Sequence, residues 1–404
     1  MLSIMIKKNL LILGLSAMMI FGAVGCGNQE ETTTQATTVE TASTTSASAT
    51  TATKDLKEYT INVTETPMMC HGNLMDIEIT KDGKIRSDLT GEWIDRDLAK
   101  RKPVACMINN LSVAMPQSGV GRADVIYEML EEGGITRLMC IFTDYDDMDQ
   151  IGPVRSTRAY YVRKAVEHQA FLVHWGRADN ALADLHGYPG VEHANFNNDD
   201  IYEPYNEPYV EGGYRLSRPG KAIEHTAYVS GKAINDFRAT QPFQLEKNEN
   251  YEKMFYFNKE DTEPAGGKDA NVITTELSAY TQPWFEYDPE TKLYNRFQYG
   301  GPHIDELTGE QLAFKNVIVL FATHSLCIPE RQNLERDAID IELLGKGEGF
   351  YASDGKIIPI TWEKETIYDV THYYTEDGEM LKLNPGKTFI SYMKDDNKEA
   401  LVVE

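Results

Sequence analysis

The sequence predicts an α+β protein: a mixed α/β N-terminal domain, residues 59–245, followed by a smaller β-rich C-terminal domain, residues 246–404. Three observations support this fold class. The chain after residue 58 is longer than one hydrophobic core usually supports. Strand-like and helix-like runs alternate up to about residue 238, and only strand-like runs follow a polar, turn-rich stretch at 239–290.

The N-terminus has the layout of an export signal. Lysines precede an apolar run at 10–24, which is too short and wrongly flanked for an ordinary transmembrane helix. The run ends in a motif that resembles a lipobox, with Ala23 where a leucine is usual and Cys26 as the lipidated cysteine. We expect a lipoprotein signal peptide at 1–25 and a diacylglycerol on Cys26. The alternative is an ordinary signal peptide with an incidental cysteine.

A tether follows the expected anchor. Residues 26–58 lack apolar periodicity and consist largely of Thr, Ser and Ala. Such a segment buries too little surface to offset its ordering entropy, so we expect disorder, with an O-glycosylated stalk as the alternative. Its average reach would be about 30 Å. The expected location is the extracytoplasmic face of the cell membrane, with the membrane as a partner through the lipid on Cys26.

The charge and the cysteines exclude several classes of site. A formal net charge of −24 argues against nucleic acid as a partner. The other cysteines, Cys70, Cys106, Cys140 and Cys327, form no CxxC pair, so the spacing predicts no metal site and no cofactor. They are expected to be buried free thiols, and a disulfide between two of them is the alternative.

The first predicted core elements are strands. An apolar run at 103–108 predicts a buried strand. Runs at 124–132 and 135–143 flank Gly133-Gly134, which predicts a hairpin with a two-residue turn. That register would place Val125, Tyr127 and Met129 on the core face with Leu138, Cys140 and Phe142, and Glu128 on the other face with Arg137. A helix at 124–132 is the competing prediction.

The next elements alternate. Residues 156–169 predict a helix capped by Ser156, and 170–176 predict a strand. A long loop is expected at 187–219, and a second helix is expected to begin near Ser230.

The C-terminal part predicts a series of strands joined by Gly-containing turns. The predicted strands lie at 294–299, 316–322, 338–344, 349–352, 356–362 and 387–392. The predicted turns are Asp354-Gly355, Asp377-Gly378 and Pro385-Gly386.

Polar residues concentrate between 109 and 176, although no standard catalytic motif occurs. The candidate ligand-binding residues are Asn110, Glu128, Glu132, Arg137, Arg155, Arg158 and His174.

Two arginines in this set suggest an anion site. Arg155 and Arg158 are one helical turn apart at a predicted helix start, where free N–H groups favour a carboxylate or phosphate. The alternative is that they pair structurally with Glu128, Glu132 or Asp144.

The two glutamates suggest acid–base chemistry only under one condition. On a strand, Glu128 and Glu132 would be about 13 Å apart, whereas a two-carboxylate glycosidase needs roughly 5–10 Å. On a helix they would be near enough. His174 ends a buried run and is more typical of a core histidine than of a base.

These motifs resemble those of the YerB-like lipoproteins, a bacterial family without a settled function. The N-terminal motifs are Asp88-Leu-Thr-Gly91, Lys102-Pro-Val-Ala105, Pro116-Gln117-Ser118-Gly119, Tyr127-Glu128, Glu132-Gly-Gly-Ile-Thr-Arg137, Ile151-Gly-Pro-Val-Arg-Ser-Thr-Arg158, Val173-His174 and His225-Thr-Ala-Tyr228. The C-terminal motifs are Asn316-Val-Ile-Val319, 347–350, Asp354-Gly355-Lys356, Thr361-Trp362 and 383–388. The resemblance implies N- and C-terminal domains behind a lipid anchor and a role near peptidoglycan. It implies no catalytic residues. The sequence departs from the family at 214–220, where the serine- and arginine-rich motif differs.

Three functions are consistent with these observations. The preferred one is a non-enzymatic lipoprotein that binds a cell-envelope ligand, such as peptidoglycan, or a membrane-bound cell-wall protein. The second is a hydrolase or transferase acting on envelope glycans, and the third is a solute-binding lipoprotein.

Overall fold

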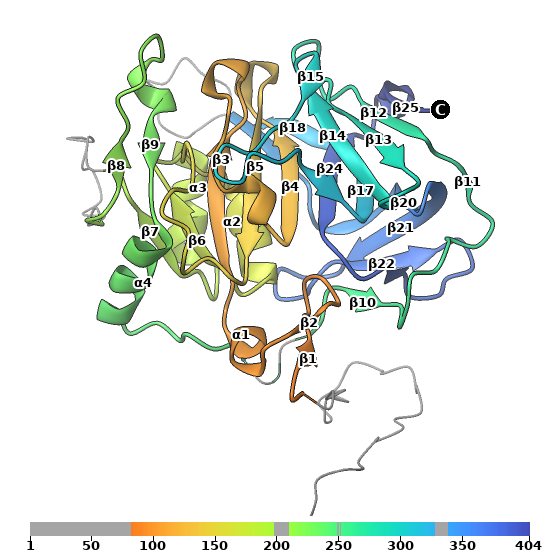
Figure 1. Cartoon of the computed structure of the whole chain (residues 1–404), viewed down its shortest axis with the longest axis horizontal. Coiled ribbons are helices and arrows are strands. Elements are labelled where there is room, and N and C mark those ends of the chain that lie inside the picture. The colour runs from red at the N-terminus through yellow and green to blue at the C-terminus, as the bar shows by residue number, and fades with distance from the viewer. Residues whose placement is uncertain (1–81, 198–209, 249, 251, 328–337) are drawn as a thin grey trace, which may run out of the picture. The chain divides into compact units, whose positions relative to one another are not determined.

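An eleven-stranded mixed sheet forms the centre of the fold (Figure 1). The computed structural model describes residues 82–197, 210–248, 250, 252–327 and 338–404. In spatial order the strands are β11 (Lys268–Asp269), β21 (Lys356–Lys364), β20 (Gly345–Ser353), β17 (Asn316–Ala322), β24 (Thr388–Lys394), β4 (Val125–Leu130), β5 (Thr136–Phe142), β3 (Val104–Asn109), β6 (Phe171–His174) and β7 (His193–Asn195), with β22 (His372–Thr375) beside β21.

A second sheet and four helices complete the main elements. The second sheet has the order β15 (Gly301–Pro302), β14 (Leu293–Gln298), β13 (Trp284–Asp288), β12 (Val272–Thr275) and β25 (Leu401–Val403), with β16 (Ala313–Phe314) beside β14. The helices are α1 (Arg96–Lys100), α2 (Ala159–Glu167), α3 (Asp179–Gly187) and α4 (Gly231–Thr240).

Four two-stranded pairs lie at the periphery. They are β1 (Ile85–Arg86) with β2 (Trp93–Ile94), β8 (Tyr214–Arg215) with β9 (Ala227–Tyr228), β10 (Tyr256–Phe257) with β23 (Lys382–Leu383), and β18 (His324–Cys327) with β19 (Ala338–Ile341).

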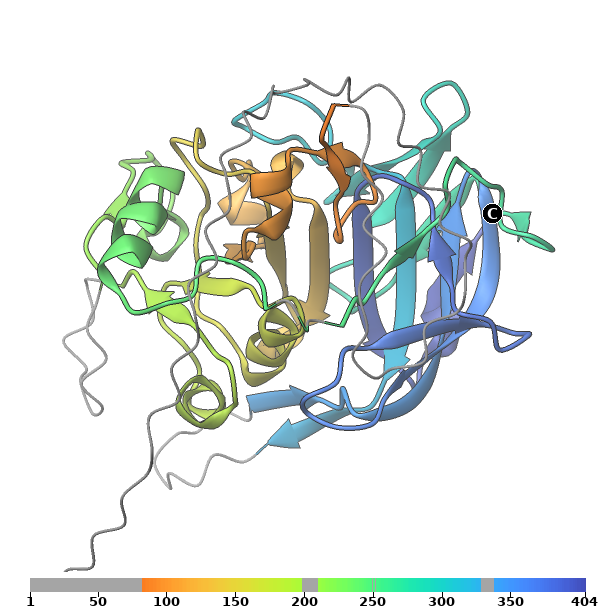
Figure 2. The same cartoon turned by 90° about the horizontal axis from the view of Figure 1, so that it is seen from below.

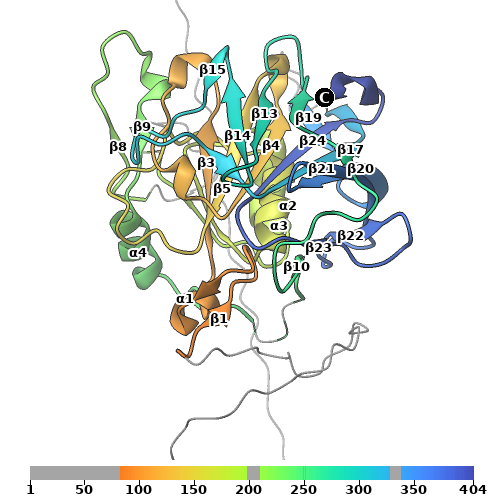
Figure 3. The same ribbon diagram turned by 45° about the vertical axis from the view of Figure 1, so that its right-hand side comes forward.

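Both faces of the central sheet are covered (Figures 2 and 3). On one face, which we call the β13 face, Ile126 and Leu138 pack in a core with Phe285 of the second sheet and Ile234 of α4. On the other, which we call the α2 face, the core includes residues of α2 and α3, such as Tyr161. This double coverage explains why β4 and β5 are apolar on both faces.

The β4–β5 hairpin was predicted correctly as an element but not in its register. Leu130 pairs with Thr136, so the loop holds five residues, 131–135, instead of the two glycines. The pairing therefore shifts by one residue. Each side chain of β4 now shares a face with the β5 side chains that the prediction had placed on the opposite face. Tyr127 opposes Met139 on the α2 face, and Glu128 opposes Leu138 on the β13 face. The predicted faces, and the alternative helix at 124–132, were wrong.

The first predicted helix is shorter than expected. It begins at Ala159, and Arg158 takes the N-cap position instead of Ser156. The residues before it, 151–158, are extended. They form isolated β-bridges with Ile108 of β3, with Ser118 and with Val229, which follows β9. The helix near Ser230 was predicted correctly. The Ser230 hydroxyl caps it by accepting a 3.1 Å hydrogen bond from the Ala233 N–H.

The C-terminal part is strand-rich, as predicted. Among the described residues after Thr240, all regular elements are strands apart from one 3-10 turn at Lys398–Ala400. The Asp354-Gly355 turn joins β20 to β21 with positive φ at both residues, which is the geometry of a two-residue hairpin. The stretch 239–290, predicted as turns, contains β10 to β13.

Strands from both sides of residue 245 lie in the same sheet. β24 runs parallel to β17 on one side and to β4 on the other. All described residues belong to one compact unit, Ile61–Glu404. The division into domains at 245 stays a prediction, but the two parts share one continuous hydrogen-bond ladder.

The expected anchor and the cysteines can be compared with the structure only in part. The signal peptide, Cys26, the tether and Cys70 lie outside the described residues. Cys106 and Cys140 are buried free thiols, as predicted, whereas Cys327 is a free thiol that is only half-buried. Within the described segments, no helix has the length and apolarity needed to span a membrane.

Candidate functional site

The candidate residues gather at one edge of the central sheet. β3, β4 and β6 run in the same direction, so their C-terminal ends meet at this edge, the upper one in Figure 1. Asn110 follows β3, Glu132 follows β4, and His174 ends β6. In open α/β sheets, ligands usually bind at this edge.

The corrected register separates the candidates into two groups. Glu128 lies on the β13 face with Leu138, whereas Arg137 opposes Met129 on the α2 face. Glu128 and Arg137 therefore do not form the single mixed face that the sequence predicted.

Glu128 and Asn110 belong to a buried network on the β13 face, which we call the Glu128 network. Glu128 Oε1 accepts hydrogen bonds from Asn110 Nδ2 at 2.8 Å and from the Thr136 hydroxyl at 2.7 Å. Glu128 Oε2 forms a 2.7 Å ion pair with Arg296 of β14. Both charged side chains are 0% exposed. The network thus joins β4 to the second sheet.

The network continues through neutral partners. Arg296 donates to Gln298 at 2.6 Å and to His303 Nδ1. His303 Nε2 in turn contacts Gln117 Oε1. Burial and the nearby Arg296 guanidinium hold the pKa of His303 well below its usual value. A neutral His303 that accepts at Nδ1 and donates at Nε2 matches both contacts.

Arginines and carboxylates form a second group, which we call the arginine cluster, at the end of β4 and the start of β5. Arg137 lies 2.9 Å from Glu131 Oε1 and donates to the Ser156 carbonyl. Arg158 donates to Glu132 Oε2 at 2.6 Å and lies 3.3 Å from Glu131 Oε2. Glu131 is fully buried between the two arginines.

The pKa shifts in the arginine cluster reflect burial without full compensation. Burial raises the pKa of Glu131 although Arg137 and Arg158 are adjacent. Burial lowers the pKa of Arg137 to about 10. For Arg158, burial acts to lower the pKa, but Glu131 and Glu132 outweigh it and raise the pKa.

Arg155 is the most accessible of the three arginines. It is half-buried and donates one side-chain hydrogen bond, to the Glu224 carbonyl at 3.1 Å. Burial lowers the pKa of Arg155, with partial compensation from the charges of Glu131 and Glu224. A guanidinium has five N–H donors, so Arg155 retains donors for a further acceptor.

The predicted helix-start anion site is absent from residues 151–158. The main-chain N–H groups of Gly152, Val154 and Arg155 donate to the carbonyls of Ser118, Ala227 and Met107. These donors are therefore occupied, and the positive character of the segment comes from its side chains. The structural alternative is right in part, since Arg158 pairs with Glu132.

His174 occupies a separate position at the end of β6. It is fully buried, its Nδ1 lies 2.9 Å from the Gly176 carbonyl, and its Nε2 lies 3.1 Å from His193 Nδ1. These contacts occupy both ring nitrogens, as in a histidine that stabilises the end of a strand.

Sequence reasoning missed two groups of residues. Glu131 gave no signal distinct from Glu132, because only the true register shows that it is buried. Arg296, Gln298 and His303 lie far along the chain from Glu128, and a contact of that range leaves no local pattern.

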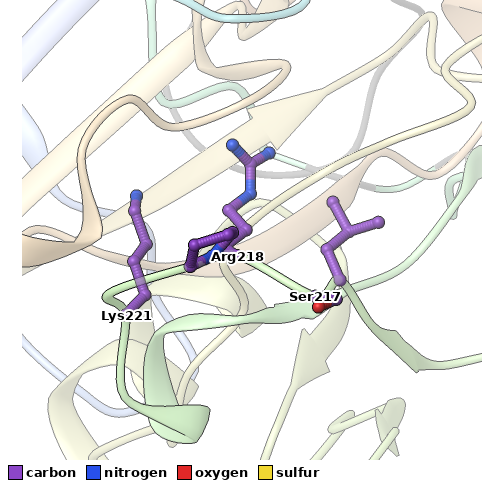
Figure 4. A pocket seen from close by; sticks show the side chains of 5 residues that line it. Ser217, Arg218 and Lys221 are labelled. Carbon is purple, nitrogen blue, oxygen red and sulfur yellow. The ribbon is translucent and has the colours of Figure 1, made fainter.

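The segment that departs from the family pattern lines a surface cavity of about 460 Å³. Arg218 and Lys221 extend to the same side of this segment (Figure 4). Arg218 forms a 2.5 Å ion pair with Glu306, and Lys221 donates to the Met115 carbonyl at 2.6 Å. These basic groups therefore hold neighbouring loops together.

In the described segments, no group of three His, Cys, Asp or Glu side chains could hold a metal ion.

Comparisons with known proteins agree on one relationship. Residues 89–244 match the N-terminal domain, and residues 273–390 the C-terminal domain, of a protein family of unknown function, DUF3048. The chain is 27% identical over 319 residues to YerB of Bacillus subtilis (strain 168), which is named as a lipoprotein; the match covers 77% of this chain and 87% of YerB. The crystal structure of the Bacillus subtilis YerB protein aligns with a TM-score of 0.64 at 26% identity, covering 79% of this chain and 99% of that chain.

Proposed function

The chain belongs to the DUF3048 family of YerB-like proteins. We propose that it is a lipoprotein on the extracytoplasmic face of the membrane and that it binds an acidic component of the cell envelope. The similarity to a protein named as a lipoprotein supports the anchor expected at Cys26. The arginine cluster supports the binding role.

One observation carries the proposal. Three arginines, Arg137, Arg155 and Arg158, lie beside Glu131 and Glu132 in a chain whose formal net charge is −24. The charges of Glu224 and Arg215 also act on Arg155, so the arginines outnumber the carboxylates by one. Arg155 has unused donors and is half-buried, so an acidic ligand would both complete its hydrogen bonds and offset the surplus charge.

The proposal is binding and not hydrolysis because neither glutamate is available as an acid or base. Both oxygens of Glu128 accept hydrogen bonds inside the Glu128 network. Glu132 is held by Arg158 and also accepts from the Ile339 N–H at 3.2 Å.

Envelope co-sedimentation tests the binding role. The full chain carrying Cys26→Ala, which removes the expected lipid, is mixed with envelopes isolated from cells that lack the protein. The added change Arg155→Gln should weaken binding at least about ten-fold, because a hydrogen-bonded charge contributes about 1.5–3 kcal/mol. Arg96→Gln is the matched control, since Arg96 is exposed on α1 at the other end of β3. Equal binding by the Arg155→Gln and Arg96→Gln chains would refute the proposal.

Cell fractionation tests the anchor separately. The unchanged chain should sediment with membranes, and the Cys26→Ala chain should be released from them. Membrane retention of the Cys26→Ala chain after a salt wash would contradict lipid anchoring at this residue.

A further inference from the structure

Exposed apolar side chains stand on loops near the arginine cluster. Val113 is 56% exposed, Ile223 65%, Tyr280 74% and Tyr299 41%. They stand on four different connections: β3 to β4, β8 to β9, β12 to β13, and β14 to β15. Single exposed apolar residues are ordinary, whereas a group on adjoining loops marks an interaction surface.

Hydrogen bonds connect these loops to one another. Lys221, beside Ile223, donates to the carbonyl of Ala114, beside Val113, at 3.0 Å. The Tyr299 hydroxyl donates to the Asn110 carbonyl at 2.7 Å. These bonds join the three loops that carry Val113, Ile223 and Tyr299.

The remaining loop and the arginine cluster adjoin the same surface. The Ser278 hydroxyl, two residues from Tyr280, donates to the Gly134 carbonyl at 2.5 Å, in the loop that follows Glu132. Arg155 donates to the carbonyl of Glu224, which follows Ile223. We call Val113, Ile223, Tyr280, Tyr299 and Arg155 together the loop surface.

We propose that the loop surface docks a protein partner through an acidic segment with apolar side chains on either side of its carboxylate. This inference rests on the proposed function, since Arg155 would receive the carboxylate. Arginine and tyrosine are enriched among the residues that dominate protein interfaces. Val113 and Ile223 favour a protein partner, because exposed aliphatic side chains complement apolar side chains and form no hydrogen bonds with the hydroxyl groups of a glycan.

In-cell crosslinking tests the inference on the lipidated full chain. The photo-crosslinking residue p-benzoyl-L-phenylalanine replaces Val113, and the same residue at Tyr368, 75% exposed on another loop, is the matched control. The Val113 position should give one discrete adduct that yields tryptic peptides of a second protein, that lysozyme leaves intact and that Arg155→Gln abolishes. The Tyr368 position should give none.

Two outcomes would overturn the inference while leaving the proposed function intact. One is an adduct that lysozyme degrades, which would identify a glycan. The other is no adduct although envelope binding still depends on Arg155. If envelope binding does not depend on Arg155, the proposed function itself fails. As a second measurement, Ile223→Ser should weaken envelope binding about ten-fold and Tyr368→Ser should not; equal binding by the two would also overturn the inference.

Discussion

Removing one partner of the ion pair between Glu128 and Arg296 should strongly destabilise this fold. Both side chains are 0% exposed and 2.7 Å apart. Glu128→Gln keeps the side-chain shape but removes the charge that compensates Arg296. The guanidinium would then keep only neutral hydrogen-bond partners, Gln298 and His303, and the Phe389 ring, whose centre is 4.9 Å away.

The magnitude follows from the burial of both charges. Removing one partner of a buried ion pair costs about 3–5 kcal/mol, because the other charge stays uncompensated. A typical folded protein has about 5–15 kcal/mol of stability in total. With a urea dependence of about 3 kcal/mol per M, the midpoint of unfolding should fall by about 1–2 M.

Urea unfolding followed by tryptophan fluorescence measures this change. Glu376→Gln, at an exposed position, is the control and should leave the midpoint unchanged. In the double variant Glu128→Gln/Arg296→Gln, the two losses should not add, since the second change removes the uncompensated charge. A loss below about 1 kcal/mol for Glu128→Gln, or strict additivity in the double variant, would refute the reasoning.

Two further predictions test other buried groups. Asp305 accepts hydrogen bonds from the N–H groups of Gly119 and Gly121 at 2.7 and 2.8 Å; Asp305→Ala should cost about 1–3 kcal/mol in thermal unfolding, and Asp305→Asn less, because one acceptor oxygen remains. Burial lowers the pKa of His168 to about 3. Below about pH 6.5 the unfolded chain binds a proton at this histidine and the folded chain does not. The free energy of unfolding should therefore fall as the pH drops from 7 to 5, by about 2 kcal/mol from this group. His168→Phe should reduce that pH dependence, and an unchanged dependence would show that His168 does not cause it.

The elements of the N-terminal part were predictable because each follows from a local pattern. β3 and β6 are short apolar runs, and α4 has a serine at its N-cap. The register of the β4–β5 hairpin was not predictable, because Gly133 and Gly134 permit both a two-residue and a five-residue loop. A difference of one paired residue was enough to place Glu128 and Arg137 on opposite faces of the sheet.

The candidate site was predictable only in its residue types. Arg155 and Arg158 were identified from their motif, but their expected helical geometry was wrong because residues 151–158 are extended chain that forms isolated bridges with residues 108, 118, 177 and 229. The role of Glu128 depends on Arg296, and a pair so distant in the sequence cannot be inferred without the fold. A buried carboxylate in a polar motif therefore predicts that a network exists without identifying its other members.

The shared sheet also determines what each part of the chain can do alone. β24 supplies the strand beside β4, Arg296 compensates Glu128, and Ile339 donates to Glu132 in the arginine cluster. A chain ending at residue 245 would lose all three contacts. It would also expose β4, which is buried along its whole length, as an unpaired edge strand. We therefore expect such a chain to aggregate instead of retaining the arginine cluster. A soluble, cooperatively unfolding fragment of residues 59–245 would contradict this expectation, and it would make the N-terminal domain an independent unit.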